Sequence, residues 1–535
     1  MNSISQKAMK EHIPLIARTK RIVLDFLATS GWIPACRQFS ISNIMGLTGI
    51  TMFLGCSTGQ EKIVSRPNIL WICFDDARAD GFSCYGKVWA KTPYIDRLAK
   101  EGVRFHNAIV QNPVCIPSRN SMKTGYYAYE AGPVEMGWEP EFEGNYIDHQ
   151  KMKNINESPI LLDAWTAVGM KPVNVGKLHA MRGHFDHRWD VPMLFDVYGN
   201  PTEYFKSRFE RGSEMLKAKR VFTKTHHWQI GGKIALAPEE TETWRLGDTA
   251  ITIIKELLDR KEPFFLRVSF SAPHVACYIP EEYFIDPAYI DLPVPSHEEL
   301  DGKPEFEKGP LKIYGGADLS EEEISLCRGT YYGMIAMVDY QVGRIIKTIE
   351  NKKQLNNTLI VVTSDQGFQL GEHGLWKKRV FYEGNIRVPF IIHYPKKLPK
   401  GVTIEEPVEL IDCLPTLMEL SGFKVPLEIR GRSLLPLING EVKQWREACF
   451  AEIDHSQSMY DELRHGTGRR IMVRTKEWKL IYFMDDRVKQ KDGALYHLIN
   501  DPDEKVNLYN HHEYQNIIYS LEHLAEEWNI GENLF

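Results

Sequence analysis

The sequence of 535 residues lacks a Cys-x-x-Cys pair, a long run of like charge, an internal repeat and a low-complexity tract. Its nine cysteines are odd in number and scattered, which argues against a disulfide framework and against a zinc site of common spacing. With 65 lysines and arginines against 71 acidic residues, the net charge is -6, and no basic arm stands out. We therefore expect no nucleic-acid partner.

The sequence does contain enough apolar material for a large core, since 43% of its residues are hydrophobic and 25% are charged. These proportions are those of a globular protein rather than of a disordered or fibrous one. The length suits three to four domains, or one large α/β domain with an accessory unit.

The first 65 residues differ in character from the rest. Basic residues dominate 1–37, residues 38–60 carry no charge, and an apolar centre at 44–54 ends just before Cys56. This order is typical of an export signal, and its centre is too short for a membrane-spanning helix. The small residue before Cys56 suits lipidation of that cysteine. We expect an exported protein, periplasmic or an outer-membrane lipoprotein of a bacterium; a disordered leader with a chance cysteine is the alternative.

From residue 66 on, apolar segments of strand length alternate with amphipathic segments of helix length. Thr92 and Pro93 mark one helix start, and a Ser-Glu-Glu-Glu capping box at 320–323 marks another. Such alternation favours a mostly parallel sheet covered by helices. The expected strands are 67–74, 103–110, 171–175, 263–270 and 359–363, and the expected helices are 93–101, 160–169, 248–260 and 320–351.

The pattern changes after about residue 440. Residues 469–483 and 494–498 resemble short antiparallel strands, and 511–528 a closing helix. The predicted fold class is therefore α/β: a large, mostly parallel sheet sandwiched by helices, with a smaller C-terminal subdomain of antiparallel sheet plus helix. The expected divisions are 1–65 (signal and linker), 66–440 (catalytic domain) and 441–535 (C-terminal subdomain).

Chemically active side chains follow three of the expected strands. Asp75 and Asp76 follow the first, Asp365 and Gln366 follow 359–363, and His274 follows 263–270. Ligands of open α/β sheets bind beyond the carboxyl ends of the strands. Clustered carboxylates repel one another unless a cation holds them, and Ca²⁺ or Mg²⁺ prefers oxygen ligands. An Asp-Asp pair taken alone also suits a solvated turn.

The most specific motif is Cys-Ile-Pro-Ser-Arg at 115–119, which chance would produce roughly 0.001 times at this composition. This motif resembles the signature of the sulfatase family. Four more segments resemble elements of that family in the expected order: Thr-Pro-Tyr-Ile-Asp at 92–96, Gly-Lys-Leu-His at 176–179, 363–383, and Asn-Asp-Pro-Asp-Glu at 500–504. The resemblance spans about residues 66–510.

The resemblance implies that Cys115 is oxidised by a maturase to formylglycine, whose hydrated form attacks sulfur and gives a sulfo-enzyme intermediate. It also implies one calcium ion, held by Asp75, Asp76, Asp365 and Gln366 together with the modified Cys115. Gln366 departs from the family pattern, in which Asn or His is more usual. An unmodified thiolate nucleophile and a merely structural cysteine are the alternatives for Cys115.

The resemblance assigns the remaining catalytic positions as well. Arg119 and Lys177 would hold the formylglycine oxygens, and His179 would take a proton in the elimination step. His274 and Lys378 would contact the sulfate and assist the leaving group. Side chains beside these positions could line the mouth of the site and bind substrate, or could belong to a structural loop: Arg78, Arg182, His184, His187 and Trp189.

We therefore expect a hydrolase of sulfate esters whose substrate is a sulfated carbohydrate. A phosphonate or phosphate ester hydrolase of the same superfamily is the first alternative. The second is an exported glycan-binding protein that has lost turnover.

Overall fold

The computed structural model describes residues 66–87, 89–132, 165–166, 172–178, 220–222, 229–275, 277–295, 299–300, 303–315, 319–455, 463, 468–484 and 492–530. The chain divides into two compact units, Met1–Ser65 and Arg66–Phe535, and every described residue belongs to the second. Among these residues, no helix has both the length and the apolar character needed to cross a bilayer. The proposed boundary near residue 440 lies inside the second unit and stays a prediction.

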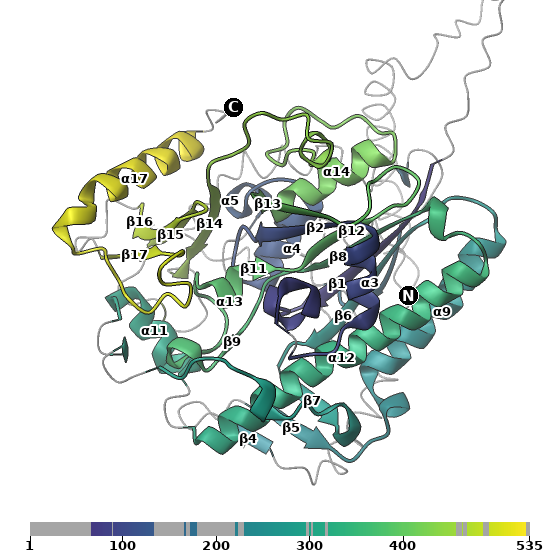
Figure 1. The fold of residues 1–535 in the computed structure, drawn as a ribbon, viewed down its shortest axis with the longest axis horizontal. Helices are drawn as coiled ribbons and strands as arrows, with labels where there is room; N and C mark the ends of the chain where they lie inside the picture. The colour runs from purple at the N-terminus through teal and green to yellow at the C-terminus, as the bar shows by residue number, and fades with distance from the viewer. Residues whose placement is uncertain are drawn as a thin grey trace, which may run out of the picture. The chain divides into compact units, whose positions relative to one another are not determined.

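An eight-stranded sheet forms the centre of this unit (Figure 1). Its order is β11-β2-β12-β8-β1-β6-β3, with β13 also paired to β2. β1 runs parallel to β6 and β8, β3 parallel to β6, and β13 parallel to β2, whereas β11 and β12 are antiparallel to their neighbours. The strands are β1 (Asn68–Asp75), β2 (Val103–Ile109), β3 (Val173–Gly176), β6 (Phe265–Pro273), β8 (Thr358–Ser364), β11 (Arg387–Val388), β12 (Phe390–His393) and β13 (Val402–Glu409).

Helices cover both faces of this sheet, and β1 shows why. All eight residues of β1 are buried. Because successive side chains of a strand point to opposite faces, alternate residues of β1 enter different cores. Leu70 and Ile72 pack with α3 (Pro93–Glu101), α9 (Glu242–Asp259) and α12 (Glu321–Asn351). Ile69 and Trp71 pack with α4 (Cys115–Thr124) and α14 (Cys413–Leu420). The predicted α/β architecture is confirmed.

Two helix starts test the sequence-based prediction of caps. The box before α12 forms: Ser320 Oγ accepts from the Glu323 N–H at 3.2 Å, and Glu323 accepts from the Ser320 N–H at 2.8 Å. At α3, Thr92 occupies the N-cap position without a capping bond from its side chain. Instead, Asp339 of α12 accepts from the N–H groups of the first turn, at 2.8 Å from Ile95. A tertiary contact thus replaces the local cap.

The C-terminal part forms a four-stranded antiparallel sheet of β14 (Cys449–Asp454), β15 (Arg469–Arg474), β16 (Trp478–Phe483) and β17 (Gly493–His497). One face of this sheet packs against α17 (Gln515–Ile530), with Leu521, Ala525 and Trp528 in the shared core. This matches the expected sheet-plus-helix subdomain.

Two smaller sheets were not expected. One pairs β9 (Gln369–Leu370) with β10 (Trp376–Lys377), and the other joins β4 (Arg220–Phe222), β5 (Gln229–Ile234) and β7 (Cys277–Pro280). The remaining α-helices of the described residues are α5 (Ala128–Ala131), α11 (Glu305–Tyr314), α13 (Glu383–Ile386) and α15 (Leu435–Ile438). The expected helix 160–169 lies mostly outside the described residues.

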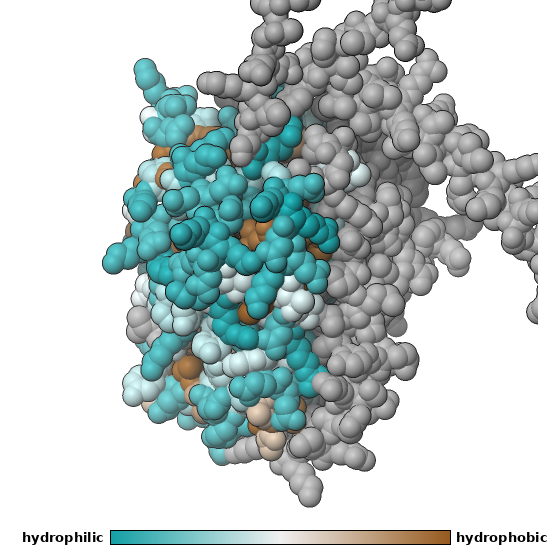
Figure 2. Space-filling view, turned by 90° about the vertical axis from the view of Figure 1, so that its right-hand side faces the viewer, coloured by the Kyte–Doolittle hydropathy of each residue, from teal (hydrophilic) through white to brown (hydrophobic). Residues whose placement is uncertain are grey.

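The face of the molecule drawn in Figure 2 is mostly polar where its residues are described. Among these residues, apolar ones occur singly or in small groups. No large apolar patch of the described residues is visible on that face.

Candidate active site

The predicted side chains meet at one edge of the main sheet. β1, β8, β3 and β6 are parallel, so their carboxyl ends lie together. There they carry Asp75 and Asp76, Asp365 and Gln366, Lys177, and His274. Cys115 joins them from the first residue of α4.

Three carboxylates form the acidic part of the site. One oxygen from each of Asp75, Asp76 and Asp365 lies within 4.8 Å of the others, and all three residues are fully buried. Among the described residues, Asp75 Oδ1, Asp76 Oδ2 and Gln366 Oε1 have no hydrogen-bond partner. Buried oxygens without donors are costly, and a hard divalent ion satisfies them. These residues therefore fit a metal ion of the calcium or magnesium kind.

Gln366 faces this cluster with its amide. Its Nε2 donates to Asp76 Oδ1, which leaves its Oε1 directed elsewhere. Turning the amide by half a rotation would exchange the two atoms and present oxygen to the carboxylates, at the cost of that hydrogen bond. The glutamine side chain thus reaches the cluster.

Three cations balance the three carboxylates. Arg119 Nε lies 2.5 Å from Asp365 Oδ2, and its Nη1 donates to Ser269 Oγ at 3.0 Å. Lys177 Nζ pairs with Asp75 Oδ2. Lys378 Nζ lies 2.8 Å from an oxygen of Asp76. Arg119 is completely buried, so its charge acts in a medium of low dielectric.

Cys115 lies beside one of these cations. Lys378 Nζ donates to its Sγ at 2.9 Å. Burial raises the pKa of the thiol, but the charges of Lys378 and Lys177 and a hydrogen bond from His274 outweigh burial, so the pKa lies below its usual value. The N-terminus of α4 favours a negative charge at the same place. Cys115 is therefore positioned as a reactive group rather than as packing.

The carboxylates respond differently to the same surroundings. Burial raises the pKa of Asp75, but Lys177, His274 and Arg119 outweigh it and hold that pKa well below the usual range. Burial raises the pKa of Asp365 to about 7 despite Arg119. Without a cation between them, the carboxylates therefore do not all ionise easily.

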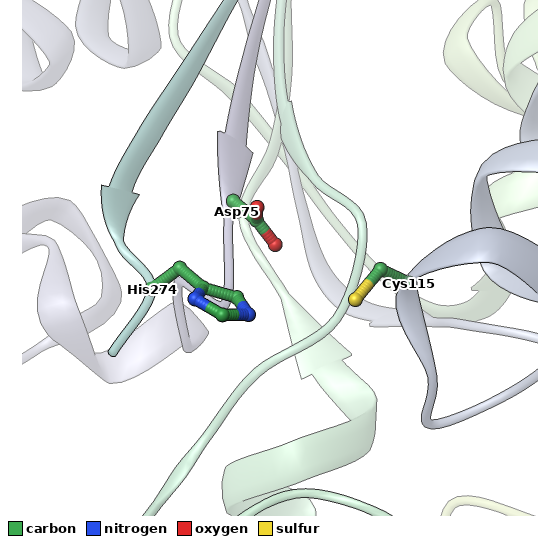
Figure 3. A group of neighbouring side chains, drawn as sticks. All are labelled: Asp75, Cys115 and His274. Atoms are coloured by element: carbon green, nitrogen blue, oxygen red, sulfur yellow. The ribbon is translucent and has the colours of Figure 1, made fainter. Parts of the chain in front are cut away.

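His274 completes the open side of the site. Figure 3 shows its ring, Asp75 and Cys115 converging on one space from three different elements. Its Nδ1 lies 2.6 Å from the Val275 carbonyl oxygen, and its Nε2 lies 3.7 Å from Asp76 Oδ2. The His274 side chain is 30% exposed, whereas Asp76 is fully buried, so the histidine stands where a ligand would enter.

Arg78 is bonded within the fold. Its side chain is 6% exposed, and its guanidinium is held by Asp80 on two bonds of 2.7 Å, by Glu372 and by the Phe368 carbonyl. Those contacts use its donors within the fold, and the prediction that Arg78 binds substrate finds no support in them. Sequence adjacency to Asp76 was a poor guide because the chain turns away after that residue, which has a φ of 69°.

Other predicted positions lie outside the described residues: His179, Arg182, His184, His187 and Trp189. Lys177 and Leu178 are the last described residues before them. Their assignments stay predictions.

The sequence reasoning missed a buried polar network behind Lys378. Lys303 Nζ donates to Tyr382 Oη at 2.7 Å, and the ring of Tyr382 stacks on His373 at 3.6 Å. Tyr382 in turn donates to Glu307 at 2.5 Å. His373 and Tyr382 lie inside the quoted motif segment, so their presence there was the available signal. Lys303 lies in no motif.

A second missed group ties the C-terminal sheet to the same segment. Lys479 of β16 is fully buried, and its Nζ donates to the Phe381 carbonyl at 2.9 Å and to Glu504 at 2.6 Å. Glu504 also accepts from the Glu383 N–H at 2.6 Å. The Asn-Asp-Pro-Asp-Glu motif, which ends at Glu504, thereby contacts the turn that follows Lys378.

Comparison with known proteins agrees with this geometry. The family model described as sulfatase matches residues 67–423, and a model of the C-terminal region of N-sulphoglucosamine sulphohydrolase matches residues 371–529. The chain is 28% identical to an N-acetylglucosamine-6-O-sulfatase of Bacteroides thetaiotaomicron, over 88% of each chain. It is 27% identical to an arylsulfatase of Clostridium perfringens, over 88% of this chain and 97% of the relative.

Solved structures share the fold. A phosphonate monoester hydrolase of Agrobacterium radiobacter superposes with a TM-score of 0.69 at 25% identity, over 86% of this chain and 95% of that one. A protein solved in complex with its substrate D-glucosamine-2-N,6-O-disulfate superposes with a TM-score of 0.60 at 22% identity, over 86% of this chain and 97% of that one.

Proposed function

The chain belongs to the sulfatase family and is a sulfuric ester hydrolase; from this we propose that it desulfates a carbohydrate, with Cys115 converted to formylglycine. The sugar part of the proposal is supported by the N-acetylglucosamine-6-O-sulfatase among its relatives. A maturase would carry out the conversion.

One observation carries the proposal: Cys115 lies beside Lys378 within a buried cluster of three carboxylates and three cations. Hydrated formylglycine would supply a hydroxyl nucleophile at this position. Calcium, held by Asp75, Asp76, Asp365 and Gln366, would supply fixed positive charge for the sulfate oxygens.

The chain's own residues supply the rest of the chemistry. Lys177 and Arg119 hold positive charge beside Asp75, close to where the hydroxyl groups at residue 115 would stand. Lys378 and His274 face the same space and suit a sulfate group together with the oxygen that leaves. Preorganised positive charge in a buried site lowers the barrier most where negative charge builds up.

Mass spectrometry and activity together test the proposal. Protein made with a maturase is digested, and the peptide with residue 115 is expected to show oxygen in place of sulfur. The same protein is assayed for sulfate release from defined sulfated oligosaccharides. Cys115→Ser should fold but turn over poorly, and Cys84→Ser, a half-buried cysteine in no motif, should stay active. Full activity of protein with an unmodified Cys115 contradicts the formylglycine proposal.

The likeness to a phosphonate monoester hydrolase favours a second activity on the same residues. Phosphonate monoesters also place anionic oxygens around a central atom, so the same cations could bind them. Comparing kcat/KM for a sulfated sugar and a phosphonate monoester decides which activity is the principal one.

Location rests on the sequence pattern of residues 1–65, which lie outside the described residues. We propose that the chain is exported to the periplasm or outer membrane and is anchored by a lipid on Cys56. Export suits an enzyme that acts on polysaccharide.

A further inference from the structure

Three different ligand atoms face one another at the open side of the site. Cys115 Sγ, an oxygen of Asp75 and a ring nitrogen of His274 lie within 4.8 Å of one another (Figure 3). Oxygen, nitrogen and sulfur together are the ligand set of zinc rather than of calcium. The ligand atoms need to move together by only about 1 Å to reach zinc distances.

We propose that the chain with an unconverted Cys115 binds a thiophilic divalent ion, Zn²⁺ or Co²⁺, through Asp75, Cys115 and His274. Conversion of Cys115 removes the sulfur ligand and leaves the oxygen set of Asp75, Asp76 and Asp365, so the conversion exchanges a zinc-type site for a calcium-type site.

A metal ion would take the place of the hydrogen bond that His274 makes to Cys115, and the other contacts of the three residues fit a ligand role. Asp75 is fully buried, and among the described residues its Oδ1 has no hydrogen-bond partner. Its other oxygen is held by Lys177, which fixes the carboxylate in place. His274 has its Nδ1 on the Val275 carbonyl at 2.6 Å, which leaves Nε2 as the ligand. A metal-binding histidine characteristically donates its other nitrogen to a backbone carbonyl in this way.

Charge favours a cation more strongly in the unconverted chain. Asp75, Asp76 and Asp365 are balanced by three cations: Arg119, Lys177 and Lys378. A Cys115 thiolate adds one negative charge to this balance, and formylglycine does not. Lys378 at 2.9 Å from Sγ can donate to the metal-bound thiolate as well as to the free one.

Both candidate sites use Asp75, so they exclude each other. An ion held by Asp75, Cys115 and His274 would occupy the space that substrate needs. Chains that escape conversion would then be stabilised in an inactive, zinc-bound form.

Cobalt titration of the full chain, produced without a maturase, tests the inference. A thiolate ligand to Co²⁺ gives a charge-transfer absorption that oxygen and nitrogen ligands do not give. One Co²⁺ per chain should bind with this band, and Zn²⁺ should displace it. Cys115→Ser should abolish the band, while Cys84→Ser keeps it.

His274→Ala is the second variant, since a 30% exposed side chain can be removed with little effect on folding. It should weaken Co²⁺ binding by at least about tenfold. A band that survives in Cys115→Ser, or cobalt affinity unchanged in His274→Ala, overturns the inference, as does the absence of a band in the folded unconverted chain. None of these measurements depends on turnover, so the sulfatase proposal stands or fails separately.

Discussion

Removal of the His274 side chain should affect two classes of substrate differently. Sugar alkoxides leave poorly and need a proton or strong positive charge, whereas phenolates leave readily. General acid assistance contributes about 10²–10⁴-fold. His274→Ala should therefore lower kcat/KM for a sulfated sugar by about 100-fold or more, and for an activated aryl sulfate much less. Measuring both constants on each protein gives the two free-energy losses.

His497→Ala is the matched control, because His497 lies on the C-terminal sheet and contacts Glu477 instead of the site. It should leave both constants unchanged. Equal losses on the two substrates for His274→Ala would mean that the ring only binds sulfate, and Lys378 would become the candidate acid.

The carboxylates give a second prediction at this scale. Asp75 and Asp76 are fully buried, and one oxygen of each has no hydrogen-bond partner among the described residues, so removing the ion should raise their mutual repulsion and disrupt the site. Chelation of the converted enzyme should abolish most activity, and Ca²⁺ should restore it. Asp75→Asn should lose activity that Ca²⁺ does not restore, whereas Asp503→Asn, at an exposed pair with Lys505, should behave as wild type. Full activity after exhaustive chelation would falsify the metal assignment.

Individual residues were predictable where a motif specified them. Asp75, Asp365 and Lys378 meet in the structure as strand ends and motif spacing indicated. The contacts of Arg78 could not be predicted, because nearness in sequence says nothing about where a guanidinium points. Its partner Glu372 comes nearly 300 residues later. The burial of Lys479 could not be predicted, because no pattern in the neighbouring sequence distinguishes a buried lysine on a strand from an exposed one.

Between elements, the contact of β16 with the segment after Lys378 yields a prediction. Lys479→Met would leave the buried carboxylate of Glu504 without this partner, which costs about 3–5 kcal/mol of folding free energy. The loop with Lys378 should also shift, and a misplacement of about 1 Å can cost up to about 100-fold in kcat. Denaturant unfolding and kinetics on one preparation measure both effects.

Lys476→Met supplies the control, since Lys476 is exposed and its nearest carboxylate, on Glu406, is 3.5 Å away. Adding Glu504→Gln to Lys479→Met should recover part of the stability, because a neutral amide needs no cation. If Lys479→Met lowers stability but leaves kcat unchanged, the contacts of Lys479 stabilise the fold and do not position Lys378.

Within the main sheet, β12 contains a histidine whose protonation is unfavourable. Burial, aided by Arg97 and Lys400, lowers the pKa of His393 to about 4 from its ordinary 6.5. The neutral ring therefore contributes stability that is complete above pH 6.5 and is lost as pH falls through 4. This loss should amount to roughly 3 kcal/mol.

His393→Gln should show a flatter decline of unfolding free energy between pH 6.5 and 4 than the wild type. Urea titrations at several pH values measure the difference between the two proteins. Parallel curves would mean that His393 does not control acid stability.

For the whole molecule, architecture was easier to predict than the boundaries of its parts. Hydrophobic runs such as 67–74 and 359–363 specified buried parallel strands because no other element suits them. The β9–β10 pair was missed because strands of two residues have no periodicity to detect. The sheet of β4, β5 and β7 was missed because its strands have three to six residues and β7 lies far from β4 and β5 in the sequence. Their pairing depends on distant neighbours that no local pattern shows.

The proposed anchor is also a property of the whole molecule. Cys56 should be lipidated in the native cell, so a fatty-acid analogue should label the wild type and not Cys56→Ala. Cys36→Ala, in the basic part of the leader, should be labelled like the wild type. A native N-terminus upstream of residue 56 argues against the anchor and leaves the catalytic proposal intact.

Cys115 is 1% exposed in the folded chain, and Lys378 is among the residues that contact it. Glu504 accepts a hydrogen bond from the turn that follows Lys378. The ribosome therefore releases residue 115 long before the parts that bury it. At 5–20 residues per second, the delay between residues 115 and 504 is roughly 20–80 s. A maturase can act on the unfolded chain during that interval. A maturase that binds later meets a thiol that is already buried.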